Sequence, residues 1–204
     1  MDSLGTDLTV ANAARVSFGK RKTKWDKTDA RLVRYLAKYK HFSPFRHLQV
    51  QFHIKAPVMR QWYKHVVGIE TTSSSSTKDH AWNEISGRYV PVKDFYVPDI
   101  WRKQSEDNKQ ASDGVLDDLQ QKRMNDTYDQ YMRQVDMTYY RMIEAGMAKE
   151  QARIVLPLSQ YTEVYWTASF QAIMNFIELR DEVTAQWEIQ QYAKVIKEST
   201  LEIY

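Results

Sequence analysis

The most regular pattern in the chain is a strict alternation of apolar and polar residues between His47 and Lys55. The apolar positions are Leu48, Val50, Phe52 and Ile54, and the polar positions are Gln49, Gln51, His53 and Lys55. Because successive side chains of a strand point to opposite faces, this alternation predicts a half-buried strand. Pro57 ends the strand and suits the first turn of a helix.

Elsewhere the apolar residues recur three and four positions apart, as on one face of a helix. Asp26 or Thr28 can cap a helix that continues to Tyr39. A long helix is expected from Val115 to Ala145, with Gly146 at its end. Further helices are predicted over residues 58–67, 148–156, 162–180 and from about 181 or 184 to 196.

The remaining segments are less regular. Residues 9–18 fit a strand or a helix, and residues 93–113 are predicted to be irregular. Serines flanked by threonines predict a flexible loop at about 67–81. With 8–18 and 85–97 as candidate partners of the strand, we expect a helix-rich α+β single domain over residues 1–204 with a small antiparallel sheet.

Composition narrows the possible chemistry. The 204 residues include no cysteine, which excludes disulfides, thiolate metal sites and a cysteine nucleophile. A net charge of only +3 is weak support for nucleic-acid binding, so no nucleic-acid partner is expected. No apolar run reaches membrane-spanning length and the N-terminal residues do not resemble a secretory signal, so a cytoplasmic location is predicted.

Three arginines stand among apolar residues: Arg88 in SGRY, Arg153 in ARIVLP and Arg180 in FIELR. A guanidinium is costly to bury without an anionic partner. That partner is either an internal carboxylate, with Glu84, Glu163, Glu178 and Glu188 as candidates, or an anionic ligand. Together with the backbone N–H groups of Ser86-Gly87, the three arginines would suit a nucleotide.

Other common sites are not visible in the sequence. It contains neither GxGxxG nor GxxxxGK, so a bound phosphate would depend on arginines and helix N-termini. His47 and His65 have no neighbours at metal-ligand spacing, and no metal site is predicted. Taken singly, each histidine fits a structural role better than a catalytic one.

Seven segments, in order, resemble the flavin-dependent thymidylate synthases, a family that works without a cysteine nucleophile. They span most of the chain: NAARVSFGK (12–20), SPFRH (43–47), RQWYKH (60–65), NEISGRY (83–89), ARIVLPLSQYTEVYWT (152–167), NFIELR (175–180) and AQWEIQQYA (185–193). The Ser-rich stretch lengthens the spacer inside the family signature, and we interpret it as an insertion, which costs little closure entropy.

The resemblance implies a reaction and its cofactors. Deoxyuridine monophosphate (dUMP) is methylated to thymidine monophosphate (dTMP), with methylenetetrahydrofolate as carbon donor and FAD reduced by NADPH as hydride source. A relative that delivers a hydroxymethyl group or acts on another pyrimidine nucleotide, and an inactive nucleotide- or flavin-binding homologue, remain alternatives. A helical nucleic-acid-binding module is a further, weaker alternative.

The resemblance also assigns residues by position. It implies that dUMP is held by Gln61, Lys64, Glu84, Ser86, Gly87, Arg88, Arg153 and Arg180. It implies that FAD is held by His47, Gln49, Lys64, His65, Glu84, Ser169 and Asn175. Arg180 matches the catalytic arginine that contacts the uracil and favours ionisation of N3, where a cation would stabilise the charge that activates C5.

The chain departs from the family pattern at several of these positions. Lys64 and Val66 replace two arginines of an Arg-His-Arg signature, which removes one bidentate fork and one charge. Ser169 stands where Asn is usual and Gln171 where Arg is usual. The altered signature favours a viral member of the family, which would work in the host cytoplasm.

The resemblance further implies a homotetramer whose active sites are built from several subunits. The long helix and the 13 tyrosines and 6 tryptophans suit such interfaces. The expected partners are otherwise the small-molecule substrates dUMP, the folate and NADPH, with no membrane.

Overall fold

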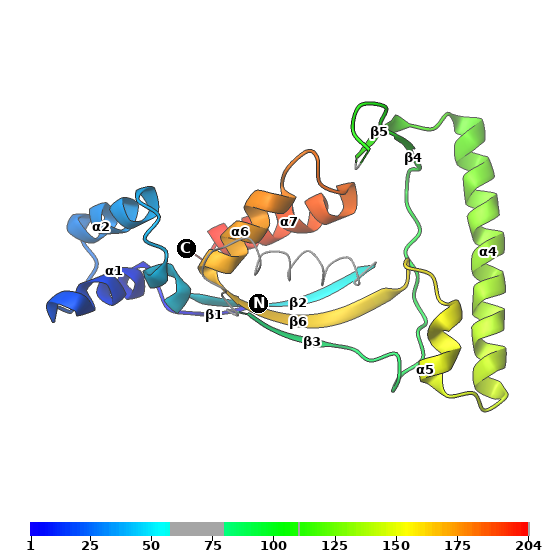
Figure 1. Ribbon diagram of the computed structural model, residues 1–204, viewed down its shortest axis with the longest axis horizontal. Coiled ribbons are helices and arrows are strands. Elements are labelled where there is room, and N and C mark those ends of the chain that lie inside the picture. Colours follow the sequence, from blue (N-terminus) through cyan, green and yellow to red (C-terminus); the bar gives the residue numbers. More distant parts are fainter. Residues whose placement is uncertain (58–79, 110, 204) are drawn as a thin grey trace.

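The computed structural model describes residues 1–57, 80–109 and 111–203. Within this part of the chain, the centre is a four-stranded antiparallel sheet in the order β1-β2-β6-β3. The strands are β1 (Asp2–Leu4), β2 (Gln49–Pro57), β6 (Tyr161–Ser169) and β3 (His80–Glu84). Figure 1 shows this sheet between an N-terminal pair of helices at one end and a long helix at the other.

The alternation found in the sequence sets the two faces of the sheet. β2 and β6 pair along their whole length, from Gln49 opposite Ser169 to Pro57 opposite Tyr161. Leu48, Val50, Phe52 and Ile54 are all buried, as the sequence predicts. His53 and Lys55 lie on the opposite face and are exposed. A slip of one residue would exchange the two faces, so the apolar set fixes the register.

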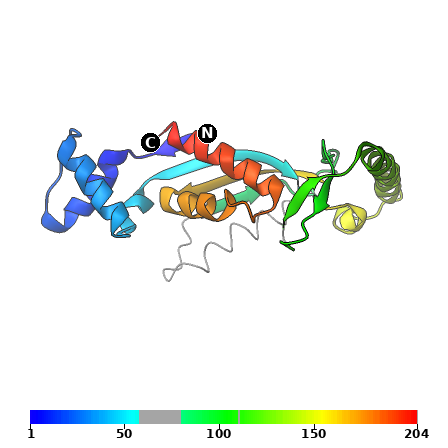
Figure 2. The same cartoon turned by 90° about the horizontal axis from the view of Figure 1, so that it is seen from above.

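Two helices cover the apolar face of the sheet, α6 (Phe170–Arg180) and α7 (Trp187–Leu201) (Figure 2). Trp166 lies at the centre of this core, with its ring centroid 5.8 Å from that of Phe52 and 5.4 Å from that of Phe176. Ser169 starts α6, because its side-chain oxygen accepts a hydrogen bond from the backbone N–H of Ala172 at 3.2 Å. Strand and helix therefore meet at one buried serine.

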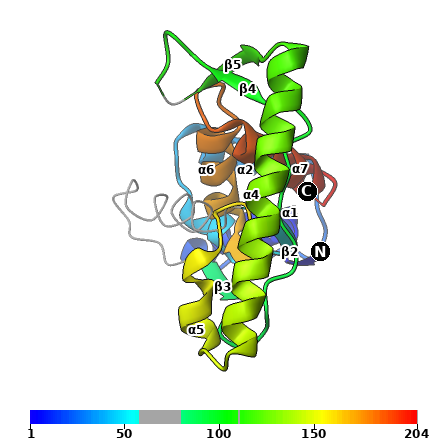
Figure 3. The ribbon, with the colours of Figure 1, turned by 90° about the vertical axis from the view of Figure 1, so that its right-hand side faces the viewer.

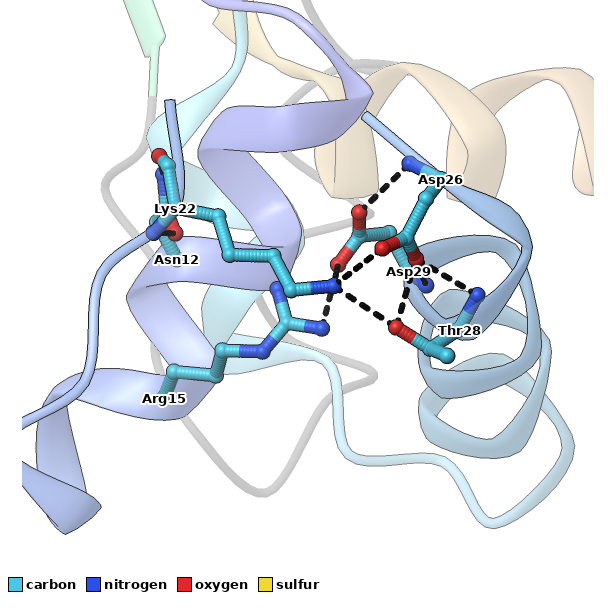
Figure 4. Close-up of polar contacts among 6 residues, drawn as sticks. All are labelled: Asn12, Arg15, Lys22, Asp26, Thr28 and Asp29. Carbon is cyan, nitrogen blue, oxygen red and sulfur yellow. Dashed lines mark hydrogen bonds and ion pairs between the residues drawn. The ribbon is translucent and has the colours of Figure 1, made fainter. Parts of the chain in front are cut away.

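The N-terminal lobe, residues 6–46, consists mainly of α1 (Asp7–Arg15) and α2 (Lys27–Lys38). Val10, Leu36, Phe45 and Leu48 form a second, smaller apolar cluster beneath it. Its polar centre is the fully buried carboxylate of Asp29, which pairs with Arg15 and lies 3.3 Å from the ammonium of Lys22 (Figure 4). Asp26 caps α2 and also accepts from Lys22 at 2.7 Å.

The opposite end carries α4 (Asp118–Glu144), which stands beyond the end of the sheet in Figure 1 and crosses in front of it in the end-on view of Figure 3. α5 (Lys149–Ala152) and the 3-10 turn Arg153–Val155 return the chain to β6. A hairpin of β4 (Arg102–Gln104) and β5 (Ser112–Val115) reaches α7, where Arg102 pairs with Glu188 and lies over the ring of Trp187 at 4.5 Å.

The structure confirms the predicted α+β class, with helices that outweigh a small antiparallel sheet. The helices predicted from Asp26 or Thr28 to Tyr39 and from Val115 to Ala145 are α2 and α4. Gly146 follows α4 with a φ of 82°, as expected for the residue that ends a helix. In the described part of the chain, no helix has both the length and the apolarity needed to cross a membrane.

The prediction of one helix over 162–180 is wrong in its first half. Residues 161–169 are strand β6, and the helix begins only at Phe170. Thr162, Val164, Trp166 and Ala168 are buried in alternation, which is the period of a strand. The aromatic residues of this segment also fit one face of a helix. Long-range pairing with β2 makes it a strand instead.

The candidate strand partners are also corrected. Residues 8–18 form α1 and the 3-10 turn Val16–Phe18, and residues 85–97 contain only a single bridge, from Phe95 to Gln160. The segment 93–113, predicted to be irregular, contains β4 and the start of β5. The final helix starts at Trp187 and continues beyond 196 to Leu201. The helix expected at 58–67 and most of the loop at 67–81 lie outside the described residues, and His80 and Ala81 belong to β3.

Candidate functional site

Glu84 ends β3 and is held there by neighbours on the same face of the sheet. Thr162 donates its hydroxyl hydrogen to one carboxylate oxygen at 2.9 Å, and the indole N–H of Trp82 approaches the other at 3.5 Å. Glu84 lies opposite Val164 in the sheet. Its carboxylate is therefore oriented, yet the residue stays exposed and able to accept from a ligand.

The chain turns sharply directly after Glu84. The backbone N–H groups of Tyr89 and Val90 both donate to the carbonyl of Ser86, at 2.9 and 3.1 Å. The N–H of Arg88 lies 3.3 Å from the hydroxyl of Ser86. These three N–H groups are satisfied by Ser86, whereas the N–H groups of Ser86 and Gly87 donate to no described residue. Free consecutive N–H groups in a tight turn favour an anion.

Two arginines flank this turn. A Cβ built on Gly87 would lie 3.8 Å from Cδ of Arg153, so the turn and the 3-10 segment after α5 touch each other. Arg153 donates from Nε to the carbonyl of Glu150 at 3.3 Å, and Arg88 lies over the ring of Tyr89 at 5.4 Å. Neither guanidinium pairs with a described carboxylate, and both are exposed. We call Ser86, Gly87, Arg88 and Arg153 the anion corner.

A cavity of about 270 Å³ adjoins the anion corner at Gly87. It is lined by Lys55, Ile85, Gly87, Val90, Pro91, Val92, Lys93, Asp94, Tyr161, Thr162 and Glu163. Lys55 pairs with Asp94 at 2.8 Å and lies over the ring of Tyr161 at 5.4 Å. The carboxylates in this lining already offset its lysines, so the uncompensated charge stays with Arg88 and Arg153.

The opposite end of the sheet contains an apolar cavity of about 230 Å³. It is lined by Ala37, Phe42, Phe45, Phe170, Gln171, Met174 and Asn175, which come from α2, the turn that follows it and α6. We call this the aromatic cavity. Its position results from the packing of the N-terminal lobe against α6, with the rings of Phe45 and Phe170 6.4 Å apart.

One polar group in the aromatic cavity lacks a partner. The side-chain oxygen of Gln171 is buried and accepts no hydrogen bond from the described residues. A buried acceptor without a donor costs free energy, so this oxygen is suited to a ligand N–H. Flat apolar walls with one amide acceptor fit part of a flavin ring, which carries one ring N–H. The residues present are thus compatible with the implied FAD.

The other residues implied for flavin lie close to the aromatic cavity. Asn175 lines it. Gln49 begins β2 directly opposite Ser169 and donates its amide to the carbonyl of Arg46 at 3.0 Å. His47 is exposed at the end of the preceding turn. Ser169 is fully buried and caps α6, so in this chain its hydroxyl serves the helix.

Arg180 lies at the C-terminal end of α6. Its Nε is buried and forms no hydrogen bond within the described residues. Burial lowers the pKa of Arg180 from its ordinary value, although a guanidinium stays charged at neutral pH. None of Arg88, Arg153 and Arg180 forms an ion pair with a described carboxylate, so there the structure offers no support for the internal salt bridges considered above. Glu188 and Glu163 instead face Arg102 and His53.

The anion corner and the aromatic cavity are far apart within one chain. Thr162, next to Glu84, and Ser169, next to Gln49, are seven residues apart along β6, which corresponds to roughly 23 Å at about 3.3 Å per residue. α6, which ends at Arg180, starts at the second end and turns back over the sheet (Figure 1). Glu84, assigned to both ligands, belongs to the anion-corner end.

Comparison with known proteins identifies the family. All 204 residues match the sequence model described as "Thymidylate synthase complementing protein". The chain belongs to the flavin-dependent thymidylate synthases. It is 40% identical to the "Flavin-dependent thymidylate synthase" of Thermosipho africanus over 196 residues, which cover 95% of this chain and 80% of the relative. The enzyme of that name from a strain of Thermus thermophilus is also 40% identical, over 97% of this chain and 68% of its own.

Solved structures support the same assignment. The structure of "a UMP/dUMP methylase PolB from Streptomyces cacaoi bound with 5-Br dUMP" matches with a TM-score of 0.81 and 30% identity, over 100% of this chain and 88% of the other. The complex with 5-Br UMP gives a TM-score of 0.80 and 28% identity, over 100% and 87%. These comparisons confirm the predicted family, enzyme class and FAD dependence, with NADPH and methylenetetrahydrofolate as co-substrates.

The site residues themselves stay predictions. Two groups of them are separated by the length of β6, and Arg180 ends α6. The first group is Glu84, Ser86, Gly87, Arg88 and Arg153, and the second is His47, Gln49, Ser169 and Asn175. Gln61, Lys64 and His65 lie outside the described residues. Among the described residues, no group of three His, Asp or Glu side chains could hold a metal.

Sequence reasoning missed two contributions to these ends. Thr162 orients Glu84, and Phe42 and Phe45 supply aromatic walls of the cavity. SPFRH is one of the segments that resemble the family, but nothing in its spacing shows that its phenylalanine would face α6. The sequence predicts a helix at Thr162, and a helix there gives no indication of its hydrogen bond to Glu84.

Proposed function

We propose that this chain catalyses the reductive methylation of dUMP to dTMP. The observation that carries the proposal is the anion corner, where two guanidiniums without described carboxylate partners flank a turn whose Ser86 and Gly87 N–H groups have no described acceptor. A nucleotide 5′-phosphate fits it, because guanidinium forks and backbone N–H groups are its usual partners. Glu84, oriented by Thr162, is placed to accept from the sugar or the base.

Arg180 supplies positive charge for the uracil in this proposal. Its half-buried guanidinium is already partly desolvated, so its field acts more strongly than that of a surface arginine. A cation beside N3 and O4 of uracil stabilises the negative charge that makes C5 nucleophilic. The folate supplies the one-carbon unit, and FAD, when bound, supplies a hydride that originates from NADPH.

The flavin is proposed to bind at the aromatic cavity, with its ring beside Phe42, Phe45 and Phe170. Gln171 would accept from the ring N–H, and Asn175, Gln49 and His47 would complete the polar rim. Gln61, Lys64 and His65 are proposed to contribute from the segment between β2 and β3. These residues bind and orient, while the transferred electrons come from the cofactor.

We further propose a homotetramer in which one site combines the anion corner of one subunit with the aromatic cavity of another. The support is the separation of roughly 23 Å within a single chain, at about 3.3 Å per residue along β6. Hydride transfer needs the flavin ring in contact with the pyrimidine. An antiparallel arrangement of two subunits would bring unlike ends together and form two equivalent sites.

The remaining predictions belong to the same proposal. The chain acts as one domain over residues 1–204, with an insertion at about 67–81 in the family signature. It works in the cytoplasm, in the host cytoplasm if the protein is viral. Its substrates are the small molecules dUMP, methylenetetrahydrofolate and NADPH.

A direct experiment is to purify the protein with FAD and to follow deoxynucleotide and folate products by mass. We expect dTMP, with a label from methylenetetrahydrofolate in its new methyl group, and NADPH oxidation that is faster with dUMP present. Absence of dTMP from a flavin-loaded, nucleotide-binding preparation would refute the proposal. A hydroxymethylated product would replace it with the related hydroxymethylase.

A second candidate function is methylation of the ribonucleotide UMP. It is favoured by the similarity, along the whole chain, to a protein described as a UMP/dUMP methylase. The same assay with UMP in place of dUMP distinguishes the two. A dUMP enzyme should show a kcat/KM for dUMP at least tenfold above that for UMP, and a ratio near one would support dual use.

A further inference from the structure

The charge of this protein is concentrated in the N-terminal lobe. Residues 15–46 contain 11 of the 29 lysines and arginines but only two of the 26 acids, Asp26 and Asp29. The rest of the chain keeps 18 cations and 24 acids, so the net charge of +3 conceals a basic lobe on an acidic body. The expectation of no nucleic-acid partner depended on the small net charge, which does not describe this surface.

Both acids of residues 15–46 are already paired within this segment. Asp29 is fully buried between Arg15 and Lys22, and Asp26 caps α2 while it binds Lys22 (Figure 4). The outer face of α2 therefore has no carboxylate to offset its cations. Arg15 and Lys22 serve this internal network and are not available to a partner.

The outer face of α2 presents four cations in a row. Lys27, Arg31, Arg34 and Lys38 follow one another at spacings of four, three and four residues, which places them on one side of a helix. All four are exposed, and none pairs with a described carboxylate. The row extends over about 16 Å, at about 1.5 Å per residue. We call these four residues the basic stripe.

Aromatic rings lie at the end of the basic stripe. Tyr35 and Tyr39 are 52% and 54% exposed, with ring centroids 4.5 Å apart. His41 is stacked 6.3 Å from Tyr35, and the ammonium of Lys38 lies 5.6 Å from the ring centre of Tyr39. Large aromatic groups of this kind are usually buried, so two half-exposed tyrosines next to each other suggest a stacking surface.

The turn that ends α2 gives independent support. The N–H of His41 donates to the carbonyl of Leu36 and that of Lys40 to Ala37, a helix-ending turn whose central residue is normally glycine. Here that residue is Lys40, with a φ of 58°. A lysine in the left-handed region is strained. The chain thus keeps a cation beside the stripe where glycine would be more stable.

We propose that the basic stripe, with Lys40, Tyr35 and Tyr39, binds single-stranded nucleic acid without sequence preference. Cations about one helical turn apart can follow successive phosphates, and the tyrosine faces can stack on bases, which is the usual combination for such binding. A polycarboxylate chain would use the cations but gain nothing from the tyrosines. The exposed aromatics therefore favour nucleic acid.

The test uses the flavin-loaded full-length protein in its native oligomer and a fluorescein-labelled oligothymidylate. The stripe variant carries Lys27→Gln, Arg31→Gln, Arg34→Gln and Lys38→Gln. The matched control carries Lys122→Gln, Arg123→Gln, Arg133→Gln and Arg141→Gln, four exposed cations of α4, for the same change in charge. Fluorescence anisotropy gives the affinity at several salt concentrations, and thermal unfolding checks the fold.

We expect the stripe variant to bind the oligothymidylate at least tenfold more weakly. The slope of log affinity against log salt concentration should become about 3 less steep, because each of four lost phosphate contacts contributes about 0.7 to it for a single strand. The control should keep both values, and thymidylate synthesis should be unchanged in both variants. Equal losses in the two variants, or no binding by the unmodified protein at low salt, would overturn the proposal. Activity is measured separately, so the result does not depend on the proposed reaction.

Two single variants separate stacking from charge. Tyr35→Ala should weaken oligothymidylate binding about fivefold or more, since stacking of one base is worth that much, while inhibition by poly-glutamate stays the same. If Tyr35→Ala binds oligothymidylate as tightly as the unmodified protein, and poly-glutamate displaces the oligonucleotide at the same concentration of negative charge, the surface binds polycarboxylates. That result would reject the nucleic-acid proposal. Lys40→Gly should raise the unfolding temperature by about 2–4 °C and weaken binding. Unchanged binding in Lys40→Gly would count against the role of Lys40.

Discussion

The two ends of the central sheet differ in how they are built. The anion corner comes mainly from residues that are neighbours in sequence, Ser86 to Arg88, and it is polar and partly exposed, with the N–H groups of Ser86 and Gly87 left without a described acceptor. The aromatic cavity is assembled from α2, the turn after it and α6, and it is apolar with one buried amide oxygen. One end is suited to a phosphate and the other to a flat ring, so a nucleotide and a flavin would be recognised by different physical principles.

Arg180 ends α6, the helix that turns back over the sheet from the aromatic cavity, and its loss should have the largest effect. Arg180→Ala should lower kcat by about 10²- to 10³-fold, because it would remove the charge that we propose lies beside the ionised uracil. Flavin absorbance and the unfolding temperature should change little, since the guanidinium forms no hydrogen bond through Nε with described residues. Steady-state kinetics of NADPH oxidation with dUMP provides the measurement. A variant with normal kcat would remove Arg180 from the chemistry.

The aromatic cavity depends on the N-terminal lobe, and Asp29 tests this dependence. Asp29→Asn leaves Arg15 unpaired in a largely buried position and should lower the unfolding temperature by roughly 5–10 °C. Flavin binding should weaken with it, whereas dUMP binding at the anion corner should remain. Thermal unfolding, with flavin fluorescence on the same samples, measures both. Loss of dUMP binding to the same extent would show that the two ends are not independent.

The same pair makes the lobe sensitive to acid. Burial raises the pKa of Asp29, but the hydrogen bonds from Asp26, Arg15 and Lys22 together lower it by more. The net shift of the pKa is therefore downward. A carboxyl whose pKa is lowered by folding stabilises the fold at any pH above its pKa in the unfolded chain, which is about 4 for aspartate. This stabilisation is lost as the pH falls through the pKa of the folded state. Stability should therefore fall below about pH 4 in the unmodified protein. This acid dependence should be smaller in Asp29→Asn.

Arg153 tests the anion corner alone. Arg153→Ala should raise KM for dUMP about 10- to 100-fold, the value of one charge-assisted bidentate contact, with a smaller change in kcat. Arg153→Lys should recover only part of the loss, because an ammonium cannot form the fork. Arg141→Ala, on α4, is the control. A change in flavin affinity with KM unaffected would place Arg153 at the other end of the site.

Gln171 tests the aromatic cavity and should give the smallest effect. Gln171→Leu keeps the volume but removes the buried oxygen, and should weaken FAD binding about fivefold to tenfold for one hydrogen bond. KM for dUMP, measured with saturating FAD, should stay the same. Flavin titration by fluorescence quenching gives the affinity. Tighter FAD binding in this variant would show that the oxygen has no donor on the flavin.

The sequence predicted the two ends unequally. The strand at 49–57 and helices α2 and α4 follow from periodicity because their burial patterns are local. β6 was mistaken for a helix because its pairing with β2 joins residues more than 100 positions apart. Ser86-Gly87-Arg88 could be recognised as an anion-binding turn from its residues alone, but Phe42, Phe45 and Gln171 have no such pattern. Their meeting depends on the packing of α2 against α6, and the flavin assignment therefore came from the family resemblance.

The central claim is that one site uses the anion corner of one subunit and the aromatic cavity of another, and subunit mixing tests it most directly. The first variant, Arg88→Ala with Arg153→Ala, lacks the corner, and the second, Gln171→Leu with Asn175→Leu, lacks the polar groups of the cavity. Each should be nearly inactive alone. After subunit exchange, a mixed pair contains one site with both ends intact, so activity should return to a substantial fraction of normal. No recovery, with exchange confirmed by native mass spectrometry, would mean that both ends act within one chain and would contradict the claim.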